Sequence, residues 1–156
     1  MTGVQTCALP ISDEPTSALD ATIQMQMVTE LRRLRDVSGI AQIIVTHNLA
    51  LAEHLGDRIA VMYAGRVVEL GRAADVLFAP RHPYTKSLIA AIPGLDGKMP
   101  VGLPGSPPLS GPAEVGCAFS PRCPCAREGC PQAVCALEDV GGGHLAACPH
   151  VKGGAE

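Results

Sequence analysis

The sequence has few aromatic residues and no dominant charge, and each shortage narrows what the chain can be. Only 3% of its 156 residues are aromatic, with two Tyr, two Phe and no Trp. Any core must therefore consist mainly of Ala, Val, Ile, Leu and Met. The formal net charge of −3 gives no basic footprint for nucleic acid. No apolar run approaches the roughly 20 residues of a membrane-spanning helix, so we expect membrane association only through a partner.

Residues 1–12 (MTGVQTCALPIS) do not have the pattern of a folded segment. Pro10 interrupts the aliphatic run before Asp13, and proline cannot donate to the ladder of a central strand. The segment also lacks the basic start and apolar core of a signal peptide. It resembles the translation of a common sequencing-adapter oligonucleotide, with Ser12 at the junction. We therefore interpret residues 1–12 as an artefactual N-terminal segment that lies outside the fold.

Residues 13–20 read DEPTSALD, and this stretch resembles the end of the Walker B strand and the D-loop of ABC-type ATPases. By that resemblance Asp13 holds Mg²⁺ on the ATP phosphates, and Glu14 is the catalytic carboxylate that polarises the attacking water. Taken alone, an acidic pair before proline is more typical of a turn or a helix start, and it is the match over all eight residues, followed by a histidine at the right distance, that favours the ATPase. The D-loop, which in the family faces a second ATPase subunit, corresponds to Ser17, Ala18, Leu19 and Asp20.

A helix is predicted after this stretch, with Asp20 as its N-cap and Gly39 just beyond its end. Its apolar residues recur at three- and four-residue spacing, which places them on one face. They are Ile23, Met27, Leu31 and Leu34. Residues 40–46 (IAQIIVT) then form a short, β-branched apolar run, which is typical of a parallel strand covered by helices.

His47 follows that strand and lies 33 residues after Glu14. The carboxyl ends of strands are where α/β sheets gather their ligands, although a lone histidine there is often only structural. In the ABC ATPases the matching histidine is the H-loop switch, which reaches the terminal phosphate. The family usually has Asp next, whereas this chain has Asn48, an adequate N-cap for a helix over 49–55.

The segment 57–70 has two apolar runs around Ala-Gly and predicts a β-hairpin. A short helix over 73–78 follows, and then a helix with Pro83 in its first turn and Leu88, Ile89 and Ile92 as its apolar stripe. The phrase PRHPYTKSLIAAIP and the Cys-rich tail resemble the C-terminal region of the ATPase subunits of bacterial oligopeptide and dipeptide importers.

Six of the seven cysteines lie between residues 117 and 148. An ATPase works in the cytosol, which keeps thiols reduced, so metal ligation is favoured over disulfides. A four-cysteine pattern like this one occurs in the peptide-importer ATPases, some of which bind a [4Fe-4S] cluster. Zn²⁺ and plain reduced thiols stay open as alternatives, and Cys125 and Cys135 are extra to the pattern. The implied ligands are Cys117, Cys123, Cys130 and Cys148.

The predicted fold is α/β: the C-terminal part of a P-loop ABC ATPase domain with parallel strands, helices and a β-hairpin, followed by a small irregular Cys-rich module. The domain would occupy residues 13–92. A linker with six Pro and six Gly covers 93–116, and the Cys-rich module covers 117–150. The phosphate-binding motif G-x-x-x-x-G-K-[ST] is absent from all 156 residues, so we expect this chain alone to bind ATP poorly.

The resemblance implies an ATP-hydrolysing subunit of a peptide importer. Its cofactors would be ATP and Mg²⁺, and its partners a second ABC ATPase subunit, identical or different, and transmembrane permease subunits. It would lie peripherally on the cytoplasmic side of the membrane. The alternative is a metal- or redox-sensing cysteine module on a degenerate ATPase scaffold. The upstream genomic sequence separates the two, because an intact phosphate-binding loop and signature motif favour the transporter.

Overall fold

The computed structural model describes residues 9–92, 102–106 and 116–151. The fold is mixed α/β and divides into two compact units, residues 1–56 and 57–156. Most of the predicted linker 93–116, and most of the segment interpreted as an artefact, lie outside the described residues. The predicted boundaries of 13–92, 93–116 and 117–150 stay predictions. In the described parts of the chain, no helix is both long and apolar enough to cross a membrane.

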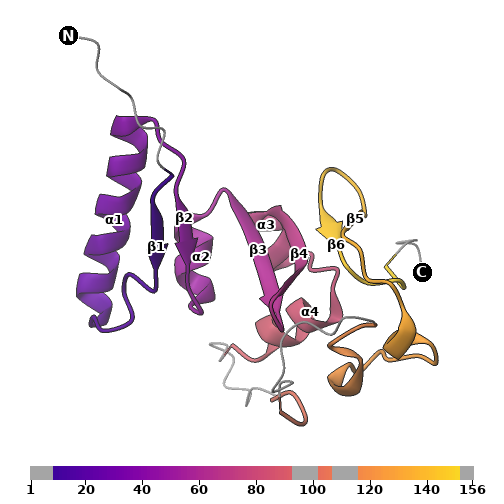
Figure 1. Ribbon diagram of the computed structural model, residues 1–156. Helices are drawn as coiled ribbons and strands as arrows, with labels where there is room; N and C mark the ends of the chain where they lie inside the picture. Colours follow the sequence, from indigo (N-terminus) through magenta and orange to yellow (C-terminus); the bar gives the residue numbers. More distant parts are fainter. Residues whose placement is uncertain (1–8, 93–101, 107–115, 152–156) are drawn as a thin grey trace. The chain divides into compact units, whose positions relative to one another are not determined.

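The first unit contains a two-stranded parallel sheet and two helices (Figure 1). Strand β1 (Ile11–Asp13) pairs with β2 (Ile43–Val45), so Asp13 lies opposite Val45. The expectation that Pro10 excludes a strand here is wrong. Pro10 lies just before the strand, where the N–H that proline lacks is not required. Its carbonyl still accepts a hydrogen bond from the Ile43 N–H at 2.9 Å. That residues 1–12 resemble an adapter is a separate prediction, which this pairing leaves untested.

Helix α1 (Ala21–Ser38) begins and ends where the sequence predicts. The Asp20 carboxylate accepts from the N–H groups of Thr22 and Ile23, both at 3.0 Å. Gly39 ends the helix in the left-handed region, at φ +61°, a conformation that glycine adopts without strain. The strand over 40–46 is confirmed as β2, and the helix over 49–55 as α2 (Leu49–Leu55), whose N-cap is Asn48.

The predicted apolar stripe of α1 is only partly correct. The buried residue of the helix is Val28, which packs with Leu51 and Leu55 of α2. Of the four predicted stripe residues only Leu31 packs against this cluster, whereas Leu34 is 53% exposed. Ile23 and Met27 are also exposed. The predicted stripe therefore lies about one residue away from Val28, the position that is buried. Such an error is easy to make, because neighbouring residues on a helix differ in direction by only about 100°.

The second unit is organised by a four-stranded antiparallel sheet in the order β3-β4-β6-β5. The predicted hairpin is confirmed as β3 (Arg58–Tyr63) and β4 (Arg66–Arg72). Ala64 and Gly65 both have positive φ, +48° and +76°, as a two-residue hairpin turn of matching twist requires. Strands β5 (Glu138–Asp139) and β6 (Leu145–Ala146) come from the Cys-rich tail, and β6 lies beside β4 (Figure 1).

The Cys-rich tail was predicted to be irregular. This prediction is only partly correct, because β6 pairs with β4. The rest of it folds as two short 3₁₀ turns, η1 (Ser120–Arg122) and η2 (Cys130–Gln132). Helices α3 (Ala73–Phe78) and α4 (Pro83–Ala90) connect hairpin and tail in sequence, as expected. The stripe predicted for α4 extends too far, since Ile92 lies beyond the helix end and is 48% exposed.

Three of the four aromatic residues gather in the core of the second unit. Tyr63, Tyr84 and Phe119 come from β3, α4 and the tail, and their ring centroids are 4.6–5.4 Å apart. Such contacts contribute about 0.5–1.5 kcal/mol each beyond burial. This cluster therefore joins the hairpin, α4 and the tail. Both tyrosines of the chain report on the folding of this unit.

The joint between hairpin and tail contains a buried carboxylate. Glu69 of β4 is fully buried and accepts three hydrogen bonds. The donors are the backbone N–H groups of Arg81 and His82, at 2.7 and 2.9 Å, and the His144 Nε2–H, at 2.7 Å. Gly71 permits this arrangement, because a Cβ there would meet the His144 ring at 3.0 Å.

A pH dependence of stability is expected from His82. Its side chain is 1% exposed, and burial lowers its pKa from 6.5 to about 4, an effect partly opposed by Glu69. Between these two values the unfolded chain binds a proton that the folded chain does not. Stability is therefore full above pH 6.5 and falls as the pH drops toward 4, by up to about 3 kcal/mol at 1.36 kcal/mol per pKa unit.

Urea denaturation followed by tyrosine fluorescence at several pH values measures this dependence. His82→Asn is the matched control, since Asn also caps a helix and so replaces the His82 Nδ1 that accepts from the Tyr84 N–H. The variant should lose most of the pH dependence between 6.5 and 4. An equally steep dependence in the variant would contradict the assignment to His82.

Candidate functional site

The first candidate site lies at the carboxyl ends of β1 and β2, where the sequence predicts it. Glu14 directly follows β1, and His47 follows β2 after Thr46. The Glu14 Oε1 accepts from the backbone N–H of His47 at 3.0 Å and lies 2.7 Å from His47 Nδ1. Because a carboxylate only accepts, Nδ1 carries the proton and Nε2 is left for another partner. The His47 side chain is 80% exposed, so Nε2 is accessible.

The backbone of Glu14 is held in an uncommon conformation. Its φ is +45°, in the left-handed region that non-glycine residues adopt at a cost of about 1 kcal/mol or more. The Glu14 N–H donates to the Val45 carbonyl at 2.9 Å, and the Glu14 carbonyl accepts from the Ser17 N–H and hydroxyl, both at 3.2 Å. These bonds fix the turn and direct the carboxylate toward His47. Such strain is often found at functional sites.

The other predicted residues of this region lie around the same turn. Asp13 ends β1 and is exposed, and its carboxylate has the oxygen chemistry that Mg²⁺ prefers. Ser17 and Ala18 are exposed, Leu19 is half-buried, and Asp20 caps α1. The structure thus brings Glu14 and His47 into contact. The roles of Asp13 and of the D-loop residues stay predictions.

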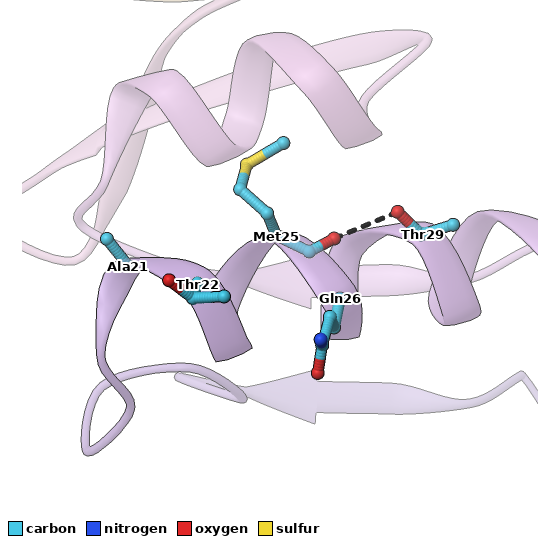
Figure 2. Close-up of a pocket in the computed structure, with 5 residues that line it drawn as sticks. All are labelled: Ala21, Thr22, Met25, Gln26 and Thr29. Carbon is cyan, nitrogen blue, oxygen red and sulfur yellow. Dashed lines mark hydrogen bonds between the residues drawn. The ribbon is translucent and has the colours of Figure 1, made fainter.

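A shallow groove lies on the exposed side of the first turns of α1 (Figure 2). Its residues are small or uncharged, and the Thr29 hydroxyl donates within the helix to the Met25 carbonyl at 2.9 Å. It contains no acid, base or nucleophile positioned for chemistry. The groove is therefore a surface feature of the helix and not the candidate active site. Its lining residues are Ala21, Thr22, Met25, Gln26 and Thr29.

The second candidate site is a cavity of about 190 Å³ in the second unit. All four cysteines of the predicted pattern line it, together with Cys125 and His150; the four are Cys117, Cys123, Cys130 and Cys148. The Cys117 N–H donates to the Cys130 carbonyl at 3.0 Å. Gly116 permits this close approach, because a Cβ there would overlap the Pro131 carbonyl. The sequence pattern therefore does converge in space, although its members are up to 31 residues apart.

Burial and neighbouring thiols raise the pKa values of three cysteines in this part of the chain. The pKa values of Cys123 and Cys148 are raised, first by burial and then by the charges of nearby thiols. Burial, and then the neighbouring Cys117, raise the pKa of Cys135 to about 11. Cys135 is not among the residues that line the cavity. Metal binding here would release protons, because thiolates are the ligand form.

The residues that the structure describes do not form a site for a single metal ion. Among the described residues, no three Cys, His, Asp or Glu side chains are arranged to hold one ion. A tetrahedral zinc ion needs four ligand atoms at about 2.0–2.3 Å from one point, which this arrangement does not provide. The four cysteines line one cavity, so a larger thiolate-bound group stays a prediction for this part of the chain. Sequence reasoning did not identify two residues of this unit: His150, which contacts Cys130, and the buried Glu69. The only signal for Glu69 was a charged residue within the apolar run VVEL.

In comparisons with known proteins, the chain is similar to ATP-binding proteins of peptide transporters. Residues 68–130 match the family model described as "Oligopeptide/dipeptide transporter, C-terminal region". The chain is 44% identical over 142 residues to the oligopeptide transport ATP-binding protein OppD of Escherichia coli (strain K12), which covers 90% of this chain and 42% of that protein. It is 46% identical over 149 residues to the probable peptide ABC transporter ATP-binding protein y4tS of Sinorhizobium fredii, covering 93% of this chain and 42% of that protein. The chain thus spans less than half the length of these relatives.

Proposed function

Because the chain belongs to the peptide-transporter ATP-binding proteins and matches their C-terminal region, we propose that it is part of the ATP-hydrolysing subunit of an ABC importer for oligopeptides or dipeptides. The observation that carries the proposal is the contact between Glu14 Oε1 and His47 Nδ1, at 2.7 Å. These two residues come from separate strands and meet where a sheet of this kind binds nucleotide.

Glu14 and His47 would divide the work of hydrolysis between them. The Glu14 Oε1 is occupied by His47, while its Oε2 takes part in no hydrogen bond that the described residues make with one another. Oε2 is therefore the atom that would orient the attacking water, because phosphoryl transfer depends on positioning the nucleophile. His47 Nε2 would contact the terminal phosphate. Bound Mg²⁺, held in part by Asp13, would neutralise charge on the phosphates.

The partners follow from the same family relationship. The subunit would pair with a second ATPase subunit, contacted through Ser17 and the rest of the D-loop, and would dock on transmembrane permease subunits. It would therefore lie at the cytoplasmic face of the membrane. Asp20 would contribute indirectly, because its carboxylate fixes the start of α1 and with it the end of the D-loop.

His47→Ala tests the proposal in the complete subunit. The variant removes the imidazole but keeps the backbone N–H that donates to Glu14, so we expect ATP turnover to fall by about 10²-fold with nucleotide binding largely kept. His54→Ala is the matched control, since His54 lies on α2 at the helix end and should not change turnover. Equal turnover in wild type and His47→Ala would exclude the switch role.

The cysteine cavity would hold a metal group in addition. Four cysteines that line one cavity would suit an iron-sulfur cluster, whose irons each take one thiolate, better than a single zinc ion, which needs its ligands around one point. The ligands would be Cys117, Cys123, Cys130 and Cys148. When bound, such a cluster supplies structural cross-linking and one-electron chemistry. A redox-sensing module on an inactive ATPase scaffold is the second candidate function, and retained ATP turnover by the complete subunit would exclude it.

A further inference from the structure

The side chain of Gln24, near the start of α1, is hydrogen-bonded to the segment that contains the D-loop. Its Nε2 donates to two backbone carbonyls, those of Thr16 and Leu19, both at 3.1 Å. Because both partners are carbonyl oxygens, only the NH₂ end of the amide can make these bonds. Gln24 is half-buried, and its own N–H donates to the Asp20 carbonyl at 2.8 Å. The helix therefore fixes the position of Gln24.

The two carbonyls belong to a turn that overlaps the turn of Glu14. In the first turn the Ser17 N–H and hydroxyl donate to the Glu14 carbonyl, both at 3.2 Å. In the second turn the Leu19 N–H donates to the Thr16 carbonyl at 3.1 Å. The two turns share residues 16 and 17, and Thr16 is buried. Gln24 therefore connects the turn that carries Glu14 to the helix.

This connection is important because Glu14 has an uncommon backbone conformation. A non-glycine residue at φ +45° persists only when the surrounding structure over-determines it. The hydroxyl bond of Ser17 is exposed, so water competes for the same groups. The two bonds of Gln24 are partly buried and hold the far end of the same segment. Without them residues 16–19 gain conformational freedom, and the direction of the Glu14 carboxylate is less well defined.

We propose that Gln24 is a positioning residue for ATP hydrolysis, because its two hydrogen bonds fix the turn from which Glu14 points toward His47. The inference rests on the proposed role of Glu14 and goes beyond it, since Gln24 takes no part in the contact between Glu14 and His47. The Gln24 amide bonds to backbone carbonyls and acts through Glu14. A carboxylate that is poorly positioned orients the attacking water poorly, and turnover falls.

Gln24→Ala in the complete subunit tests the inference. We expect kcat for ATP hydrolysis to fall about tenfold while the Kd for ATP stays nearly unchanged, because no group that would hold the phosphates is removed. Gln24→Glu keeps the shape of the side chain, but a carboxylate cannot donate, so kcat should fall at least as far. Gln26→Ala is the matched control and should keep wild-type turnover, since Gln26 is an exposed glutamine of the same helix (Figure 2).

A double-mutant cycle with Glu14→Gln separates positioning from a loss of stability. If Gln24 acts through the Glu14 carboxylate, adding Gln24→Ala to Glu14→Gln should change single-turnover hydrolysis by less than about twofold, because the positioned group is already gone. A merely structural role would give the same loss of turnover in both backgrounds. Thermal unfolding of each variant, measured on the same preparation, shows that folded proteins are being compared. If Gln24→Ala does not fold, Gln24→Glu takes its place in the cycle.

The four variants of the cycle distinguish the failure of this inference from the failure of the proposed function. Reduced turnover in Glu14→Gln with wild-type turnover in Gln24→Ala would overturn the positioning role and leave Glu14 catalytic. Equal losses from Gln24→Ala in both backgrounds would also overturn it, because Gln24 would then act on the fold. Wild-type turnover in Glu14→Gln would overturn the proposed function, and the positioning role with it.

Discussion

Replacing Glu14 by Gln in the complete subunit is expected to lower ATP turnover by about 10²-fold or more, with ATP binding retained. The amide keeps the shape of the side chain, and its oxygen can still accept from the His47 N–H, which now donates to Oε1 at 3.0 Å. It removes the second carboxylate oxygen, which would orient the water. Binding would be kept, because in the proposed subunit backbone N–H donors outside this chain, together with Mg²⁺, would hold the phosphates.

Steady-state phosphate release and equilibrium nucleotide binding, measured on the same preparation, check this result. Glu30→Gln is the matched control, because Glu30 is exposed on α1 and pairs only loosely with Arg33, at 3.4 Å. It should turn over ATP like the wild type. Turnover by Glu14→Gln within a few-fold of wild type would remove the catalytic assignment, and loss of ATP binding would show that Glu14 acts on the fold instead.

Replacing Glu69 by Ala is expected to destabilise the second unit by about 3–5 kcal/mol, the range for breaking a buried pair. The change leaves three donors without their acceptor: the N–H groups of Arg81 and His82 and the His144 ring. Each buried donor without a partner costs about 1–3 kcal/mol. Because β4 and α4 meet through Glu69, the loss also loosens the wall of the cysteine cavity, to which Arg81 and His82 belong.

Urea denaturation followed by tyrosine fluorescence measures this unit alone, since Tyr63 and Tyr84 both lie in it. Glu128→Ala is the control, because Glu128 is exposed and its loss should change stability by no more than about 0.5 kcal/mol. Glu69→Gln should fall between the two, since one amide oxygen can still accept. A loss below about 1 kcal/mol in Glu69→Ala would contradict the proposed joint.

Local elements were predictable because their signals are local. The caps at Asp20, Gly39 and Asn48 lie within a few residues of the backbone groups that they satisfy, so the sequence predicts both ends of α1 and the start of α2. The same holds for the hairpin, where Ala64 and Gly65 alone determine the turn. Errors appeared where a choice depended on packing: Val28 is buried, and not Leu34, because α2 covers that side of the helix.

The sequence by itself determined the chain's family resemblance, its candidate residues Glu14 and His47, and the four cysteines, because short motifs with fixed spacing carry these. Only the tertiary structure decided which groups meet. It brought His47 Nδ1 to Glu14, gathered four distant thiols around one cavity, and added β6 of the tail to the sheet of the hairpin. It also brought Glu69 together with its three hydrogen-bond donors, which are 12, 13 and 75 residues away in the sequence. Such contacts leave no periodic pattern in a sequence, since their energy comes from burial and hydrogen bonding between segments that only folding makes neighbours.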